Sequence, residues 1–218
     1  AYHRVVVRAT TRVRKIANAR PGYADLSRAQ FREQGGKKLI TDGSDMTCQH
    51  DAVLCCIRRL GITASRSKML EACPPVDGKP PPLAQMIAYV RDVLGLEMLD
   101  LTSGPDTFHR KKHGPAYHVL QCENSDYTYM CVVKATVEDE DGEESDELHC
   151  LAYLPGYYCA TRSSCSGALV DNDPRIAVRM LDDGDRTVEG ARAVFDSLFM
   201  TAKSVRITLV YRIGRLTA

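Results

Sequence analysis

The chain has 218 residues, of which 44% are hydrophobic and 26% charged, and its formal net charge is +1. A chain of this length buries roughly 70% of its unfolded surface, so we expect one compact core that needs neither disulfides nor metal ions. No apolar run reaches the roughly 18 residues that a membrane span requires, which argues against a membrane-spanning protein and against a membrane partner.

The cysteine content indicates a reducing compartment. There are nine cysteines, they fit core positions of the expected helices and strands, and no signal peptide stands at the start. Because nine is an odd number, we expect free thiols in an intracellular protein, cytoplasmic or mitochondrial, rather than a secreted disulfide scaffold. His109, His113 and Cys122 are conceivable zinc ligands, but no Cys-x-x-Cys pair accompanies them. We therefore predict no metal and no cofactor.

Positive charge is concentrated at the start of the chain. Residues 1–38 contain ten Lys and Arg residues against two acidic ones, which is ten minus two, or +8. The segment has little apolar periodicity, so it is predicted to be a basic N-terminal arm, either solvated or derived from an organelle-targeting sequence. Contact with RNA or an acidic partner is the alternative, although few aromatic side chains are present to stack on bases. Residues 39–218 are expected to form the folded domain.

Helices are expected first along the chain. The pattern that starts at Cys48 continues to about Leu60 and stops at Gly61, a suitable C-cap. A short helix should follow from Ser65 or Ser67 to about residue 73. A third helix is indicated after three consecutive prolines, because apolar residues recur at helical spacing from 83 to 94.

Strands are expected to dominate the second half. Short β-rich runs predict strands at 96–101, 116–122, 127–137, 148–154, 168–170 and 176–181, and a helix at 187–200 precedes a last strand at 205–213. Helices followed by short strands predict an α+β fold with an antiparallel sheet.

An acidic run separates two of these strands. Residues 138–147 are almost all Asp and Glu. The run predicts a hairpin with a long acidic tip, which stays hydrated and mobile because its charges repel one another. The tip could also fold back on the basic arm, since the two charges nearly cancel.

One thiol has the position of a nucleophile. Cys48 stands where a turn-rich loop gives way to a helix, and the helix N-terminus favours thiolate over thiol. His149 lies in a later strand, and the carboxylates of Asp171 and Asp173 stand at the end of the strand after it. A thiol nucleophile needs an imidazole to take its proton, and the imidazole needs an acceptor on its other nitrogen. A cysteine, a histidine and an aspartate occur in that order along the chain, and His118 is a rival base.

Four stretches in sequence order resemble the papain-like cysteine peptidases, and the Josephin and C39-like groups more than papain itself. They are residues 43–50 around the thiol, residues 85–97, the strand that carries His149, and residues 169–171. The resemblance covers about residues 40–180. It implies the papain-like cysteine peptidase fold, with N-terminal helices packed on an antiparallel β-sheet and the active site between the two layers.

The resemblance also implies roles for individual residues. Cys48 would be the nucleophile, His149 the general base and then acid, and Asp171 the residue that orients His149. Asn172 and Asp173 are alternative orienting residues, the latter because Asp173-Pro174 is similar to an Asp-Pro of the C39 group. In the oxyanion region, Asp42 and Asp45 stand where papain-like enzymes usually have Gln or Asn, while the OTU group has an Asp three residues before its cysteine. Cys150 follows His149 where an aromatic residue is common, so another side chain has to cover the imidazole.

The first functional hypothesis is a thiol-dependent peptidase or deubiquitinase-like isopeptidase that acts through an acyl-enzyme. Its partner would be a polypeptide, with ubiquitin or a ubiquitin-like protein implied only by the Josephin resemblance. The alternative is a catalytically inactive papain-like domain that serves as a structural or RNA-associated subunit of a larger assembly. A third hypothesis shares the three residues but transfers the acyl group to an amine.

Overall fold

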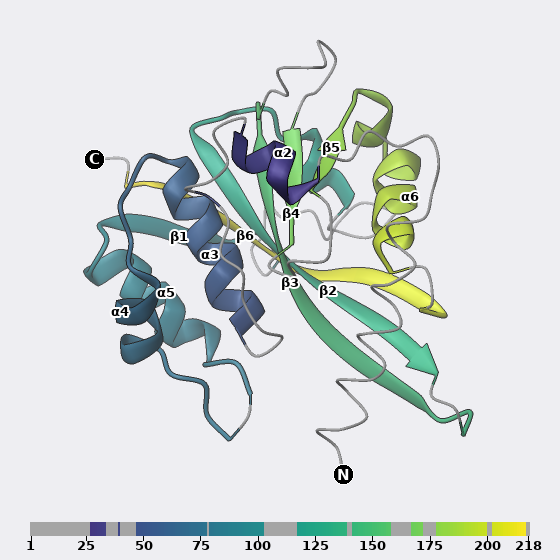
Figure 1. The fold of residues 1–218 in the computed structure, drawn as a ribbon, viewed down its shortest axis with the longest axis horizontal. Helices are drawn as coiled ribbons and strands as arrows, with labels where there is room; N and C mark the ends of the chain where they lie inside the picture. Colours follow the sequence, from purple (N-terminus) through teal and green to yellow (C-terminus); the bar gives the residue numbers. More distant parts are fainter. Residues whose placement is uncertain are drawn as a thin grey trace.

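One antiparallel sheet organises the part of the chain that the structure describes. The structure is a computed structural model, and it describes residues 27–33, 39, 47–77, 79–102, 117–138, 141–157, 167–171, 178–199 and 202–216. Within these residues the sheet has six strands in the order β1-β6-β2-β3-β4-β5 (Figure 1). The predicted α+β class and the antiparallel sheet are confirmed. The strands are β1 Leu96–Asp100, β2 Tyr127–Glu138, β3 Glu144–Pro155, β4 Gly167–Val170, β5 Arg179–Leu181 and β6 Ser204–Arg215.

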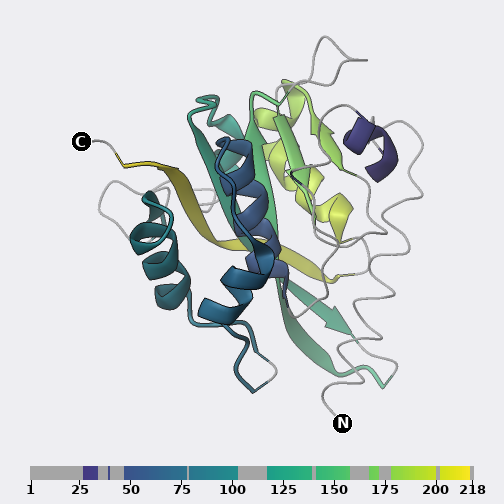
Figure 2. The ribbon, with the colours of Figure 1, turned by 60° about the vertical axis from the view of Figure 1, so that its left-hand side comes forward.

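Helices cover both faces of the sheet. Figure 2 shows α3, α4 and α5 on one side of it and α6 on the other. Side chains alternate between the faces along each strand, so β2 and β3 contribute to two separate hydrophobic clusters, one under α3 and one under α6. The helical elements are α2 Arg28–Glu33, α3 Cys48–Arg59, α4 Arg66–Ala72, α5 Leu83–Asp92 and α6 Val188–Leu198, with 3-10 turns η4 Tyr117–Gln121 and η5 Gly184–Arg186.

The helix boundaries in the first half of the chain agree with the sequence signals. Gly61 follows α3 with φ +78° and Gly95 follows α5 with φ +64°, a left-handed conformation that only glycine adopts without strain. The Ser65 side chain accepts the Lys68 backbone N–H at the start of α4. These local caps are why all three predicted helices are confirmed.

The strand predicted at 116–122 is wrong for the residues described there. Residues 117–121 form η4, and Val119 and Leu120 are buried in the cluster under α6. The Tyr153 hydroxyl donates to the carbonyl oxygens of Leu120 at 3.3 Å and Cys122 at 2.9 Å. The Tyr153 side chain therefore provides these two carbonyl groups with the hydrogen-bond donor that a neighbouring strand would otherwise supply.

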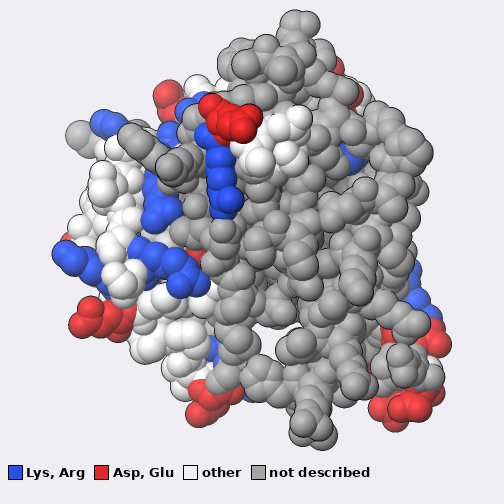
Figure 3. Space-filling model, viewed as in Figure 1, with Lys and Arg blue, Asp and Glu red and all other residues white. Residues whose placement is uncertain are grey.

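The predicted hairpin is present, but β3 begins at Glu144 rather than at Leu148. Pairing continues outward to Glu138 opposite Glu144, so only a short turn remains as the tip. Lys203 forms ion pairs with Glu138 and Glu144, and Lys134 pairs with Asp146. Figure 3 shows acidic and basic side chains together at this end of the molecule. Cations on neighbouring strands thus offset the repulsion that the acidic run creates.

A helix that the sequence did not indicate lies within residues 1–38. The Phe31 side chain of α2 is fully buried, and its ring centroid lies 4.9 Å from that of Tyr157. This part of the segment therefore packs on the domain core. Residues 1–26 and 34–38 lie outside the described residues, so the basic arm and its boundary with the domain at 39 stay predictions.

Among the described helices, none combines the length and apolar character needed to cross a bilayer.

Truncation of Phe31 tests whether α2 is part of the domain. We expect Phe31→Ala to lower the free energy of unfolding by about 3 kcal/mol, because it leaves a cavity beside Tyr157. Urea denaturation measures this change. Glu33→Ala on the same helix is exposed and should stay within about 0.5 kcal/mol of the parent. Equal effects of the two substitutions would contradict the packing of α2.

Candidate active site

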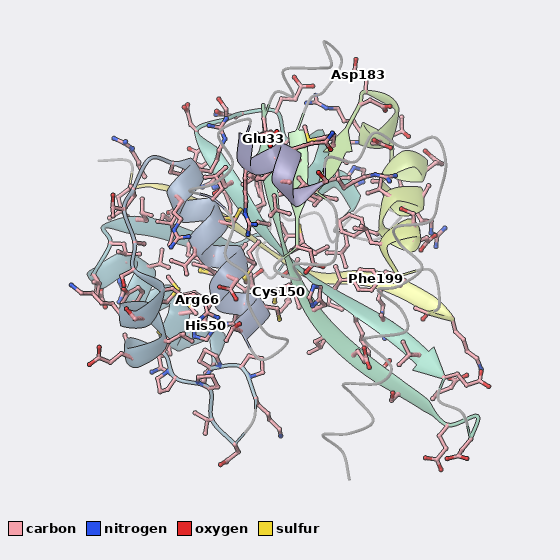
Figure 4. The ribbon with its side chains drawn as sticks, in the orientation of Figure 1. Glu33, His50, Arg66, Cys150, Asp183 and Phe199 are labelled. Carbon is pink, nitrogen blue, oxygen red and sulfur yellow. The ribbon has the colours of Figure 1, made fainter. Side chains whose placement is uncertain are left out.

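Cys48 is the first residue of α3, and this helix is buried from Cys48 to Ile57. The helix packs mainly on β3, with smaller contacts to β2 and β6. Its N-terminal end therefore lies against the part of β3 that carries His149 and Cys150. Figure 4 shows Cys150 beside this end of α3, with His50 and Arg66 toward α4 and Phe199 on the side of α6.

The surroundings of Cys48 favour its thiolate form. The pKa of Cys48 lies well below the usual value, chiefly because its sulfur accepts a hydrogen bond from the Cys150 side chain. Burial opposes this shift, whereas a hydrogen bond and charge from His149 and the backbone N–H of Cys150 add to it. Hydrogen bonds and a nearby positive charge thus outweigh the cost of desolvating the anion.

His149 and Asp171 form a buried pair. His149 Nε2 lies 2.8 Å from Asp171 Oδ2, and each residue is 6% exposed. Burial alone lowers the pKa of His149, but the charge and hydrogen bond of Asp171 together with Cys48 raise it to about 10. Asp171 thus binds Nε2, and Cys48 is a further hydrogen-bond partner of the ring. The predicted site residues Cys48, His149 and Asp171 thus lie together.

Strand register explains why these two residues meet. The β3–β4 ladder has its last pair at Ala152 opposite Val170, and Asp171 comes directly after β4. His149 and Asp171 each lie an even number of residues from Leu151 and Leu169, which are buried on the α6 side of the sheet. Past Val170 the described residues place no further strand on the β4 side of β3, whereas β2 still pairs with it on the other side. The N-terminal end of α3 reaches His149 at this open edge.

Phe199 covers the imidazole from the α6 side. Its ring centroid lies 6.0 Å from that of His149, with the rings inclined by 70°. Phe199 is the C-cap of α6 and is itself buried. Phe199 is thus the side chain that covers the imidazole, as was expected of a residue other than Cys150. Nothing in the sequence pattern pointed to a residue fifty positions downstream.

A buried polar network fixes the first turn of α3. Asp51 accepts hydrogen bonds from Thr47 Oγ1 at 2.7 Å and from Arg66 Nε at 2.8 Å, and Arg66 also donates to Thr47 at 2.9 Å. His50 Nε2 lies 2.6 Å from the carbonyl oxygen of Cys73. These contacts join the turn that carries Cys48 to α4 and the segment after it. No sequence signal pointed to this network, because Arg66 is remote from Asp51 along the chain.

Several predicted residues lie outside the described residues. They are the oxyanion candidates Asp42 and Asp45, the alternative orienting residues Asn172 and Asp173, and the conceivable zinc ligands His109 and His113. The rival base His118 is described and lies on η4, where its Nδ1 is 3.0 Å from Gln121 Oε1. Since η4 contacts α6 and η5, His118 lies away from Cys48.

No group of three or more metal-ligating side chains suitable for an ion occurs among the residues that the structure describes. A cavity of about 540 Å³ is present, but it lies at the C-terminal end of α3. Its lining comes from Arg59, Leu60, Ser125, Asp126, Tyr127 and Arg215. The cavity and the Cys48 site thus lie at opposite ends of this helix.

Comparisons with known proteins give one structural likeness. No family model and no curated protein matches the chain. Among solved structures, the chain is similar to the peptidase domain of Streptococcus ComA, described as a bi-functional ABC transporter involved in a quorum-sensing pathway. The likeness has 8% sequence identity and a TM-score of 0.40, and it covers 81% of this chain and 97% of that one. At this level it carries no argument about chemistry, which depends on the residues described above.

The pH dependence of alkylation tests the Cys48–His149 pair. Iodoacetamide reacts with thiolates, so labelling of Cys48 should persist well below about pH 8.5, where an ordinary thiol protonates. Because the pKa of Cys48 is lowered, its thiolate protonates and labelling stops only in acid. At the alkaline end, His149 loses its proton as the pH rises through about 10, and the thiolate–imidazolium pair is then lost. Peptide mapping between about pH 5 and 9 gives the profile.

His149→Ala is the control for this profile. It removes the cation, so the labelling midpoint of Cys48 should move to higher pH. Because trypsin leaves Cys48, Cys55 and Cys56 in one peptide, fragment spectra must assign the label. An unchanged midpoint in His149→Ala, or a Cys48 no faster than Cys55, would contradict the pair.

Proposed function

We propose that this protein is a thiol-dependent peptidase or isopeptidase that acts through an acyl-enzyme on Cys48. One observation carries the proposal. The sulfur at the N-terminus of α3 is hydrogen-bonded to an imidazole whose other nitrogen is bound to a carboxylate at 2.8 Å. This is the arrangement that a nucleophile, a general base and an orienting residue require. A papain-like arrangement of helix and sheet is part of the proposal.

Each residue has a defined part in the proposed reaction. The Cys48 thiolate attacks the substrate carbonyl carbon, and main-chain N–H groups at the start of α3 stabilise the negative charge on the oxygen. The His149 imidazolium then gives a proton to the leaving amine, which produces a thioester on Cys48. Neutral His149 accepts a proton from water in the second step, so that the thioester is hydrolysed and the thiolate restored. Asp171 holds the ring orientation throughout.

An exposed apolar side chain supports a polypeptide substrate. Leu148 is 66% exposed and precedes His149 on β3. It lies two residues from Cys150, so both belong to the face of the sheet that α3 covers. A substrate segment extended along β3 toward Cys48 would contact Leu148. Ubiquitin or a ubiquitin-like protein, with its extended C-terminal tail, is the finer proposal for this substrate.

Covalent capture tests both levels of the proposal. A ubiquitin C-terminal vinyl sulfone and a set of peptide vinyl sulfones should label Cys48 in the full chain but not in Cys48→Ala. Labelling by the ubiquitin reagent supports the isopeptidase, and labelling by peptides alone restricts the proposal to a peptidase. Asp171→Asn keeps the shape of the side chain but loses its charge, and we expect labelling to slow by about tenfold to 100-fold. Failure of all reagents would contradict the proposal.

Burial of the site favours a second candidate, an inactive papain-like domain that serves as a structural or RNA-associated subunit. Cys48 is only 3% exposed and both of its partners are below a tenth, which is also typical of packing residues. In this case Cys48 should resist the reagents, while the full chain is retained on RNA at low salt and released at high salt. Deletion of residues 1–26 should abolish retention and, because it spares α2, leave stability unchanged. Salt-independent retention would contradict an electrostatic role of the arm.

A further inference from the structure

Two thiols from different elements meet at the candidate site. Cys48 begins α3 and Cys150 lies on β3, and the Cys48 sulfur accepts hydrogen bonds from both the side chain and the backbone N–H of Cys150. Both residues belong to the cluster between α3 and the sheet. We infer that Cys48 and Cys150 form a redox modification site, in which a small hydroperoxide converts the two thiols into a reversible disulfide. The effect of this disulfide on activity rests on the proposed function, but its formation does not.

The geometry favours this pair for bridging. Cys48 begins the helix that packs on β3, and both thiols belong to the buried cluster between the two elements, where Cys150 is the largest influence on the Cys48 thiol. A disulfide then requires the two neighbouring sulfurs to close to about 2.0 Å. Cys48 is also the first residue of its helix, where a small shift leaves the intrahelical hydrogen bonds intact. Cys73 differs, because its thiol lies 3.7 Å from a carbonyl oxygen, that of Gln85. All seven described cysteines are free thiols in the structure.

The two thiols differ in protonation, so they have different roles in the oxidation. The pKa of Cys150 is raised well above its usual value, first by its hydrogen bond to Cys48 and then by burial, so it keeps its proton. Cys48 is the thiolate and reacts first with the oxidant. Cys150 is then the resolving thiol, already in contact with the sulfur that has been oxidised.

The reaction balances in two steps. The Cys48 thiolate attacks one oxygen of the hydroperoxide, its O–O bond breaks, and a proton taken up by the leaving oxygen yields an alcohol or water and a sulfenic acid on Cys48. The Cys150 sulfur then attacks the Cys48 sulfur, the S–O bond breaks, and the Cys150 proton leaves with the hydroxide as water. The peroxide gains two electrons and the two thiols lose two. A dithiol reductant reverses the change by thiol–disulfide exchange.

Burial selects the oxidant. Cys48 is 3% and Cys150 6% exposed, so hydrogen peroxide fits the site better than a bulky disulfide reagent. The disulfide would remove the nucleophile and bond the N-terminal end of α3 to β3. It would also prevent further oxidation of Cys48 to sulfinic acid, which thiols do not reverse. The site would thus switch off reversibly under oxidising conditions.

Mass spectrometry of the full chain tests the inference without an activity assay. Reduced protein is treated with hydrogen peroxide, free thiols are blocked with N-ethylmaleimide, and the protein is digested with trypsin without reduction. We expect a linked pair of peptides, 39–58 and 135–162, that dithiothreitol separates. These peptides also contain Cys55, Cys56 and Cys159, so fragment spectra must assign the bridge to Cys48 and Cys150.

Cysteine variants test the assignment of the bridge independently of the fragment spectra. Cys48→Ser and Cys150→Ser should each abolish the linked pair completely, and Cys150→Ala serves if the serine variant fails to fold. Cys73→Ser is the matched control, since a hydroxyl can donate to the same carbonyl of Gln85, and it should keep the linked pair. In both Cys150 variants, Cys48 should proceed to sulfinic acid.

Three results would overturn the inference. They are oxidation of Cys48 to sulfinic acid in the parent chain with Cys150 fully alkylated, a bridge assigned to other cysteines, and survival of the bridge in Cys150→Ser. Reactivity toward the vinyl sulfones is measured separately before oxidation, after oxidation and after dithiothreitol. A reduced chain that forms the bridge but never reacts with these reagents contradicts the proposed function and supports the redox site.

Discussion

The candidate site is built around the burial of α3 against β3. Ten consecutive residues of this helix are buried, so its position is set by the sheet below it and by α4 beside it. Because Cys48 is the first of these residues, its place is fixed as firmly as that of the core. The contacts of Asp51 with Thr47 and Arg66 then hold the turn that carries the thiol. The proposed nucleophile and the core are thus parts of one packed unit.

Burial makes the charged groups of the site energetically costly, and the surrounding groups offset this cost. A thiolate, an imidazolium and a carboxylate sum to one negative charge, and an isolated charge in the interior is strongly unfavourable. The positive end of α3 contributes about half an elementary charge at Cys48. The side chain and backbone N–H of Cys150 donate to the same sulfur. The cation of His149 lies between the two anions, so each charge has a partner.

The open edge of the sheet determines where chemistry can occur. β4 opposes β3 only from Ala152 to Pro155, so the stretch of β3 that holds His149 has α3 and Phe199 as neighbours instead. A longer β4 would separate Cys48 from His149. Cys150 meets Cys48 on the face of the sheet that α3 covers, so the packing of α3 on β3 underlies both the proposed catalysis and the proposed disulfide.

Features that depend only on residues close together in the chain were predictable from the sequence. The glycine stops after α3 and α5, the serine cap of α4 and the alternation of the strands are local, so these elements and the α+β class were predictable. Cys48 could be named because a helix start marks it, and His149 and Asp171 because a histidine in one strand and a carboxylate at the end of the next follow it along the chain. Tertiary structure decided the rest, since contacts between distant segments leave no local pattern. The Tyr153 hydroxyl on β3 binds carbonyl oxygens of the 3-10 turn η4, where a strand was predicted. Phe199, which follows α6, covers His149. The Cys48–Cys150 contact likewise arises only when α3 lies on β3, because packing alone brings residues a hundred positions apart together.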